Sequence, residues 1–428
     1  MVARAAEPVR PMIVTREALL RGVLATMLAL SCVSFIEPSP YEIFFFLLIP
    51  VATLAGLGFS RTTITLYFII AALVIGQLLA LAPYFDHRKL DNGLSPDVYT
   101  IYSAYMWSSA VLFALIFARQ TGPRATLAIR AYAFSCAFAG VWSLLSYFDV
   151  AGIAAREPIV GRVAGPFKDP NVLGSYCILG SIAFMQAVFF GSSRWRLVNA
   201  VGLLLATCGT FLSFSRGSWG ALIFATLIFI VSTYWTADDR AMRRRIRRGL
   251  AALALLVVVV GAFAASNATL RDTIGDRAKV EQDYDGGVTG RFGNQKRSIP
   301  MLMARPLGFG PMRFETIFGL DPHNSYVGAF ASGGWLGGFS FFAMVFATGF
   351  LAVRLMVLRS PFMRQAQVVG PALIALFLQA FQIDVDHWRF VWLMVGMVWG
   401  MESGRVAYGM LQARERRRRM PQDALAAA

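Results

Sequence analysis

One histidine and two arginines are the residues of this sequence whose chemistry most clearly suggests a reaction. His323 lies in the run Asp321-Pro-His-Asn-Ser-Tyr326. An imidazole with a pKa of about 6.5 can accept the proton of a hydroxyl group. Arg216 and Arg291 carry guanidinium groups, which stay protonated and can hold phosphate oxygens in a two-pronged geometry. These residue types predict a transfer reaction in which histidine activates a hydroxyl and arginines stabilise negative charge in place of a metal ion.

Each of these residues also has a plainer structural explanation. A lone histidine is more often structural than catalytic. An arginine at a membrane boundary often snorkels towards water or closes a salt bridge at a helix end, and this applies to Arg216 and to Arg162. The residues must therefore be weighed together, by their order and by the side of the membrane on which they fall.

A competing signal is the pair Asp384-Val-Asp386, whose spacing is found in metal sites of many nucleotide-sugar transferases. Paired carboxylates can hold Mg²⁺ or Mn²⁺. Nucleotide sugars are cytoplasmic, however, and this turn is predicted on the opposite side of the membrane. We therefore favour a salt-bridged turn that includes Arg389 over a metal site.

The composition sets the class of protein. The chain has 428 residues, of which 57% are hydrophobic and only 15% charged, and its mean hydropathy is +0.58. A soluble chain usually carries about a quarter charged residues. The composition therefore predicts an integral membrane protein and excludes a cytosolic enzyme, a disordered regulator and a secreted disulfide scaffold. Membrane topology explains the net charge of +16 better than nucleic-acid binding does.

The elements that position the candidate residues are predicted to be membrane helices. A helix needs about 20 apolar residues to cross the hydrocarbon core. The sequence predicts an all-α fold with about 12 such helices. They are expected near residues 18–36, 42–59, 62–84, 99–118, 125–148, 171–190, 195–213, 217–235, 249–266, 325–353, 365–383 and 388–405.

The distribution of lysine and arginine orients these helices. If both termini are cytoplasmic, the densest basic clusters, Arg240–Arg248 and Arg414–Arg419, lie on the cytoplasmic side. Contact with anionic lipid headgroups accounts for their charge there. The candidate histidine and arginines then fall on the outer side.

Four parts make up the predicted organisation. Residues 1–266 hold helices one to nine, and residues 267–324 form one long outer loop that folds as a cap with short helices. Residues 325–405 hold helices ten to twelve, and residues 406–428 form a basic cytoplasmic tail. A loop this long is usually functional or disordered.

Six short motifs follow one another in a particular order between residues 161 and 337. They are Gly-Arg-x-x-Gly-x-Phe-x-x-Pro-Asn at 161–171, Ser-Arg-Gly at 215–217, Gly-Arg at 290–291, Pro-Leu-Gly-Phe-Gly at 306–310, His-Asn-Ser-Tyr at 323–326 and Gly-Gly-Trp-Leu-Gly at 333–337. In this order the sequence resembles the O-antigen ligase and Wzy-type O-antigen polymerase superfamily of bacterial inner-membrane proteins. Two features depart from it. Gln295 and Lys296 stand where many relatives have a tryptophan, and Lys168 adds an unexpected charge.

The resemblance implies a metal-independent glycosyltransferase with a GT-C-like helical membrane fold, no cofactor and an active site on the periplasmic face. Its donor would be a glycan on undecaprenyl diphosphate, and its acceptor a hydroxyl of lipid A core or of another glycan. Its partners would include membrane lipids but no nucleic acid. The catalytic residues would be His323, Arg216 and Arg291, and the substrate-binding residues Arg162, Lys168, Asn171, Asn324, Tyr326 and Arg389.

Alternatives stay open at this stage. We favour ligation over polymerisation because the His-Asn-Ser-Tyr run is more ligase-like. A flippase for lipid-linked glycans predicts charged groups within the helices and two similar halves, which are not evident. A membrane scaffold predicts that alanine at Arg216 and His323 is harmless. His323 could also bind diphosphate instead of acting as a base.

Overall fold

In the computed structural model, residues 15–84, 95–157, 161–266, 287 and 290–419 are described. Throughout these residues the regular structure is helical. The α-helices are α1 (Arg16–Ala29), α2 (Pro40–Ala55), α3 (Arg61–Leu81), α4 (Pro96–Phe117), α5 (Thr121–Tyr147), α6 (Pro170–Phe190), α7 (Arg196–Leu212), α8 (Arg216–Trp235), α9 (Arg240–Ser266), α11 (Arg291–Met303), α12 (Arg313–Phe318), α13 (Ser325–Val357), α14 (Met363–Gln379) and α15 (Arg389–Arg419). Three short 3-10 helices, η1 (Ala82–Tyr84), η2 (Val150–Arg156) and η3 (Ser193–Trp195), lie between them.

Seven helices of the described chain are long and apolar enough to cross a membrane, namely α3, α4, α5, α6, α8, α13 and the helical segment η3–α7. Helix α2 is apolar but shorter. The protein is therefore an all-α membrane protein, as predicted. Every one of the twelve predicted stretches coincides with a helix, but α1 and α14 have only 14 and 17 residues. The number twelve stays a prediction.

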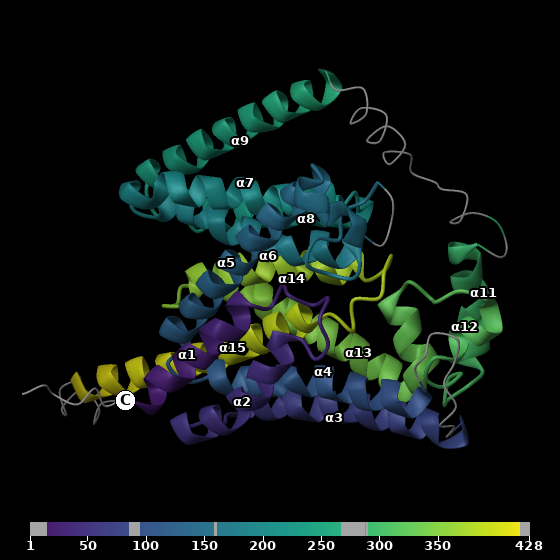
Figure 1. Cartoon of the computed structure of the whole chain (residues 1–428). Coiled ribbons are helices and arrows are strands. Elements are labelled where there is room, and N and C mark those ends of the chain that lie inside the picture. The colour runs from purple at the N-terminus through teal and green to yellow at the C-terminus, as the bar shows by residue number, and fades with distance from the viewer. Residues whose placement is uncertain (1–14, 85–94, 158–160, 267–286, 288–289, 420–428) are drawn as a thin grey trace, which may run out of the picture.

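The long helices lie side by side, and the chain reverses direction from one to the next (Figure 1). At one end of this bundle α13 begins, α14 ends, and α11 and α12 cover the helix ends. We call this the site end. At the other end α9 begins and α15 ends, and we call it the basic end. The second half of α9 diverges from the rest of the bundle (Figure 1).

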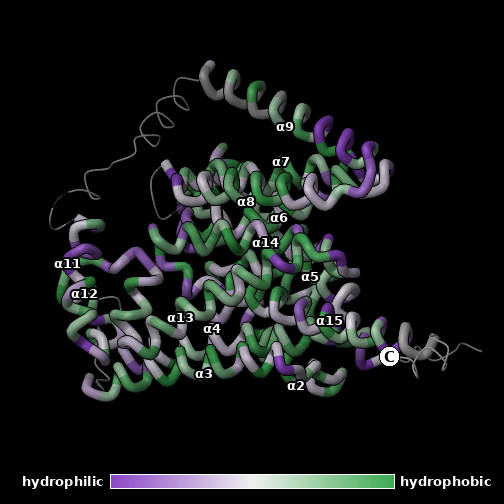
Figure 2. Tube along the Cα trace, turned by 180° about the vertical axis from the view of Figure 1, so that it is seen from behind, coloured by the Kyte–Doolittle hydropathy of each residue, from purple (hydrophilic) through white to green (hydrophobic). Residues whose placement is uncertain are grey.

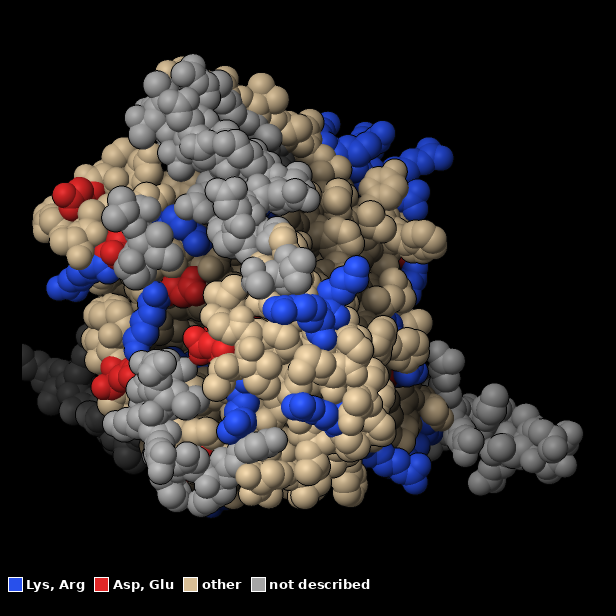
Figure 3. Space-filling model, turned by 90° about the vertical axis from the view of Figure 1, so that its right-hand side faces the viewer, with Lys and Arg blue, Asp and Glu red and all other residues tan. Residues whose placement is uncertain are grey.

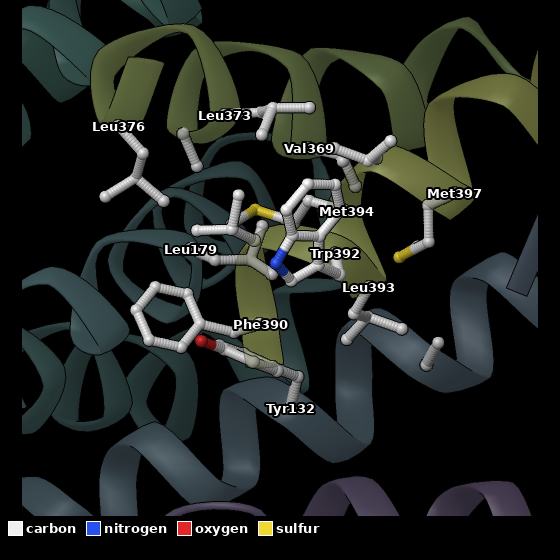
Figure 4. Packing of buried hydrophobic residues seen from close by; sticks show 14 of the residues in the cluster. Tyr132, Leu179, Val369, Leu373, Leu376, Phe390, Trp392, Leu393, Met394 and Met397 are labelled. Atoms are coloured by element: carbon white, nitrogen blue, oxygen red, sulfur yellow. The ribbon is translucent and has the colours of Figure 1, made fainter. Parts of the chain in front are cut away.

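The hydropathy of the residues changes between the middle of the bundle and its two ends. Figure 2 shows hydrophobic residues along the middle of the bundle and hydrophilic residues in the first turns of α9 and in α11. The core is built around α15, where Trp392 is fully buried among Leu373 and Leu376 of α14 and Leu179 of α6 (Figure 4). Burial of such side chains fixes the spacing of the helices and hence of their polar ends.

Helix α1 ends earlier than the sequence predicted. The apolar run continues to Ile36, but the helix stops at Ala29. Beyond it, the backbone N–H of Cys32 donates to the Ser135 hydroxyl, 3.1 Å away. The backbone N–H of Ser34 donates to the carbonyl of Pro166 at 3.0 Å. Tertiary hydrogen bonds therefore replace the last helical turns.

Helix α13 is interrupted where two of the sequence motifs meet. Gly334 has a φ of 61°, which breaks the helical path, and the N–H of Trp335 donates to the carbonyl of Pro306 at 2.8 Å. The N–H groups of Phe309 and Gly310 both donate to the carbonyl of Ala331. A Cβ on Gly334 would lie 2.2 Å from the Pro306 oxygen, so only glycine fits. The segment 306–310 thus fills the break in α13.

Candidate functional site

His323 immediately precedes α13 and faces a carboxylate from another part of the chain. Its Nδ1 lies 3.7 Å from Oδ2 of Asp384, in the turn between α14 and α15. His323 has a φ of 43°, an uncommon left-handed conformation for a residue other than glycine. Its side chain is 45% exposed, so a substrate can reach it. A histidine whose Nδ1 faces a carboxylate is suited to proton transfer through Nε2.

Arg291, the first residue of α11, is brought to His323. Its Nη2 donates to the backbone carbonyl of His323 at 3.3 Å. Helix α11 is tied to the same segment by Gln295, whose amide donates to the carbonyl of Pro322 at 2.8 Å and accepts from the Asn324 amide at 3.4 Å. Gln295 thus has a positioning role at a point where the sequence had only suggested a departure from the family.

The residues that follow His323 are fixed by hydrogen bonds inside the fold. Asn324 caps α13 by accepting from the N–H groups of Tyr326 and Val327, and its own N–H donates to Asp384. The Ser325 hydroxyl accepts from the N–H of Val385 at 2.7 Å. Tyr326 is buried and its hydroxyl donates to the carbonyl of Phe377. The polar groups of Asn324 and Tyr326 therefore hold His323 against the Asp384 turn, and direct substrate contact by them stays a prediction.

Arg216 lies at the same end of the bundle, across the end of α14. It is the half-buried first residue of α8, and Ser215 caps that helix. Two residues further along, the Ser218 hydroxyl hydrogen-bonds to Ser175 of α6 at 2.9 Å, and Ser175 donates to Gln379 at 3.1 Å. Gln379 is the last residue of α14. This buried polar contact fixes the start of α8 relative to the chain that leads to Asp384.

Arg162, Asn171 and Lys168 lie around the start of α6. Arg162 donates to the Asn171 amide oxygen at 2.8 Å and to the carbonyl of Ser213 at 3.1 Å, which joins the segment 161–171 to the Arg216 turn. Lys168 is exposed and forms an ion pair with Glu37. The structure thus connects Arg162 and Asn171 to the turn that holds Arg216, whereas Lys168 contacts Glu37, which follows α1.

The turn from Asp384 to Arg389 is not closed by the internal salt bridge that the sequence suggested. Asp386 pairs with His387, whose Nδ1 lies 3.1 Å away. Arg389 reaches α2 instead, where it forms an ion pair with Glu42 and donates to the Ser39 hydroxyl at 2.7 Å. Arg389 pairs with Glu42 because α2 passes beside the start of α15, a neighbourhood that sequence distance conceals.

The carboxylates of this turn have opposite pKa shifts. Partial burial, with the negative charges of Asp386 and Asp321, raises the pKa of Asp384 to about 7. Burial also opposes ionisation of Asp386, but the neighbouring His387 outweighs it and lowers the pKa of Asp386. The Asp386 carboxylate in turn raises the pKa of His387, against the effect of burial. Asp384 therefore titrates near neutral pH, directly beside His323.

A cavity of about 200 Å³ opens at this end between α1, α2, α4, α6 and α15. Lys168 and Arg389 supply positive charge, Glu37 and Asp169 negative charge, and aromatic rings form much of its wall. Such a mixture of rings and charges suits sugars and anionic groups. The cavity is lined by Leu28, Ser31, Ser34, Glu37, Tyr41, Tyr102, Tyr132, Phe167, Lys168, Asp169, Val172, Tyr176, His387, Trp388, Arg389, Phe390 and Leu393.

Figure 3 views the molecule from the site end and shows basic and acidic side chains on both sides of a hollow. Residues 201–342 match the family model described as O-antigen ligase. We refer to residues 201–342, which are similar to this family, as the O-antigen ligase domain. This match confirms the resemblance to the O-antigen ligase and Wzy-type superfamily. A search among curated proteins finds no match.

The O-antigen ligase domain includes Arg216, Arg291 and His323. Asp384 and Gln379 lie beyond its last residue, and the segment 161–171 lies before its first. The sequence pointed to Asp384 only as half of a metal pair, and it gave no sign of Gln379 at all. Their positions depend on α14 and α15 packing beside the ligase domain, which single-sequence motifs do not reveal.

Proposed function

We propose that this protein transfers a glycan from undecaprenyl diphosphate to an acceptor hydroxyl at its site end. The observation that carries the proposal is the pair of His323 and Asp384, with Arg291 hydrogen-bonded to the His323 backbone. His323 and Arg291 lie in the segment that matches the O-antigen ligase family, and Asp384 lies beyond it. A base, its orienting carboxylate and fixed cations are the groups such a displacement requires.

In the proposed step, Nε2 of His323 takes the proton of the acceptor hydroxyl. The acceptor oxygen forms a bond to the anomeric carbon, and the bond from that carbon to the diphosphate oxygen breaks with its electron pair. A single displacement of this kind inverts the anomeric configuration. The Asp384 carboxylate, whose Oδ2 lies 3.7 Å from Nδ1 of His323, stabilises the imidazolium that forms by its negative charge.

Negative charge develops on the departing diphosphate. We propose that Arg216 and Arg291 stabilise this charge and that Arg162 contributes to the stabilisation. Arg162 is bonded to Asn171 and to the Ser213 carbonyl, so it holds the Arg216 turn and also carries charge next to it. Lys168 and Arg389 line the neighbouring cavity, where they would bind the glycan or its acceptor. Asn171, Asn324 and Tyr326 are proposed to position these groups.

We infer a bacterial inner-membrane location, with the site end on the periplasmic face and both termini in the cytoplasm. The support is the positive-inside rule, because the clustered arginines of α9 and α15 lie at the opposite end of the bundle.

Ligation to lipid A core is the leading reaction, and polymerisation by a Wzy-type mechanism is the alternative. Deleting the gene and measuring the glycan left on undecaprenyl diphosphate separates them. Long polymer stranded on the outer face supports ligation, whereas single repeat units stranded there support polymerisation. Material trapped on the cytoplasmic face contradicts both and indicates a flippase.

A further inference from the structure

A large cavity lies at the basic end, away from the proposed reaction. It is a groove of about 1260 Å³ between α5, α6, α7, the first turns of α9 and the start of α14. Ligand sites for drug-sized molecules are about 300–1,000 Å³. The groove therefore has room for a larger, elongated molecule.

Four arginines line this groove, and no aspartate or glutamate does. They are Arg130 of α5, Arg194 of η3, Arg245 of α9 and Arg364 of α14. Arg130, Arg194 and Arg245 are exposed, and none of the four forms an ion pair with the described residues. Four different elements thus bring positive charge to one place, and no carboxylate lines the groove beside them, although Asp238 acts on Arg364 from outside it.

Arg364 shows how the groove is built. Its guanidinium lies 4.4 Å from the centre of the Phe190 ring and donates to the sulfur of Met242. The Gln186 amide donates to the Arg364 carbonyl at 2.7 Å. These contacts hold α6, α9 and α14 together while leaving the groove open.

Below the arginines the walls are apolar. On α5 the lining continues from Arg130 to Ala137, which is about 10 Å along a helix. These walls include Phe134, Phe184 and Leu205. Trp195 also lines the groove, next to Arg194 in η3, and its side chain is exposed. Tryptophan is typical of the membrane–water interface. The groove therefore combines a cationic rim at headgroup level with apolar walls at the depth of acyl chains.

We propose that this groove binds an anionic phospholipid, with its phosphate held by the arginines and its acyl chains against α5, α6 and α7. Guanidinium groups pair with phosphate in a two-pronged geometry, and basic pockets between membrane helices suit charged lipid headgroups. This site is separate from the proposed transfer reaction and does not depend on it.

The test is lipid binding by the full-length protein in detergent, followed by native mass spectrometry. The probes are dioleoylphosphatidylglycerol and, as the neutral counterpart, dioleoylphosphatidylcholine. We expect saturable binding of phosphatidylglycerol that is at least about tenfold tighter than binding of phosphatidylcholine. Equal affinity for the two lipids would overturn the proposal, because the groove would then bind acyl chains without distinguishing an anionic headgroup from a neutral one.

A matched pair of double variants locates the site. Arg130→Gln with Arg245→Gln removes two charges from the rim, and we expect phosphatidylglycerol affinity to fall about tenfold. Arg244→Gln with Arg248→Gln removes two charges from α9 outside the groove, and we expect a change below about twofold. An equal loss in both variants, or no loss in the first, would show that the groove is not the site.

Thermal unfolding of the unmodified protein covers the case in which the first variant does not fold. Phosphatidylglycerol should raise Tm by more than phosphatidylcholine does at the same concentration, because ligands that bind the folded state stabilise it. The absence of such a difference would also overturn the proposal. Glycan transfer is not part of either readout, so the result is independent of the proposed function.

Discussion

The two ends of the helix bundle use charged side chains in different ways. At the site end, Arg389 and Glu42 form an ion pair in which the side chains are only 18% and 14% exposed. At the basic end, Arg359 and Asp238 form a pair whose side chains are 84% and 68% exposed. One pair is enclosed by other helices, and the other is surrounded by solvent.

This difference extends to the whole of each end. At the site end, His323 and Arg291 come from one part of the chain and contact groups from another, so packing fixes their positions. At the basic end, the exposed arginines of α9 act mainly through their positive charge. Reaction chemistry requires fixed geometry, whereas topology and lipid attraction require only charge. Four experiments, two of them with a matched control variant, test this comparison.

The largest effect is expected for His323→Ala. Loss of the general base should lower the rate of glycan transfer by about a thousandfold. The measurement is transfer from a lipid-linked donor to acceptor by purified protein, with thermal unfolding as the control for folding. A rate within tenfold of the unmodified protein would mean that His323 is not the base.

The next effect concerns stability and compares the two ion pairs directly. Arg389→Ala leaves the enclosed Glu42 without its partner, and we expect a loss of about 3 kcal/mol in the free energy of unfolding. Arg359→Ala removes the same charge from the exposed pair and should cost less than about 1 kcal/mol. Thermal unfolding in detergent checks both variants. Similar Tm values would contradict the distinction between the two ends.

Within the site end, Arg291→Ala is expected to lower the transfer rate by about a hundredfold, because a fixed cation that stabilises the leaving group is lost. Lys296→Ala provides the matched control, since Lys296 is exposed on the same helix and carries the same charge. Kinetics of both variants, at saturating donor, should differ by at least tenfold. Equal transfer rates in the two variants would mean that Arg291 contributes only a surface charge and does not stabilise the leaving group.

The smallest effect is expected for Asp384→Asn. Because the pKa of Asp384 is about 7, its carboxylate forms as pH rises through neutrality, and only this form can stabilise the imidazolium of His323. The rate of the unmodified protein should rise from pH 6 to 8. The variant should be about tenfold slower at pH 8, well below the effect in a preformed triad, because 3.7 Å is longer than a hydrogen bond.

The pH profile of this variant is the more specific readout. Asparagine does not titrate, so the increase in rate between pH 6 and 8 should become smaller. A profile identical to that of the unmodified protein would show that Asp384 does not orient the base.

Apolar patterning predicted the class of protein and the approximate place of each long helix, because the hydrocarbon core imposes a length and a polarity on every helix that crosses it. Short motifs, and not the apolar pattern, predicted the resemblance to O-antigen ligases, since the motifs around Arg216, Arg291 and His323 are local in sequence. Helix α1 was an exception. Its apolar run continues past Ala29, but hydrogen bonds to Ser135 and Pro166 end the helix.

Only the tertiary structure decided which residues surround the candidate base. Asp384 comes to His323 because the Ser325 hydroxyl accepts from Val385, and Gln379 fixes α8 through Ser175 and Ser218. Arg389 pairs with Glu42, far from it in sequence. A residue's type and the polarity of its segment are properties of the sequence. Its partners are set by side-chain packing between helices, which depends on the whole chain.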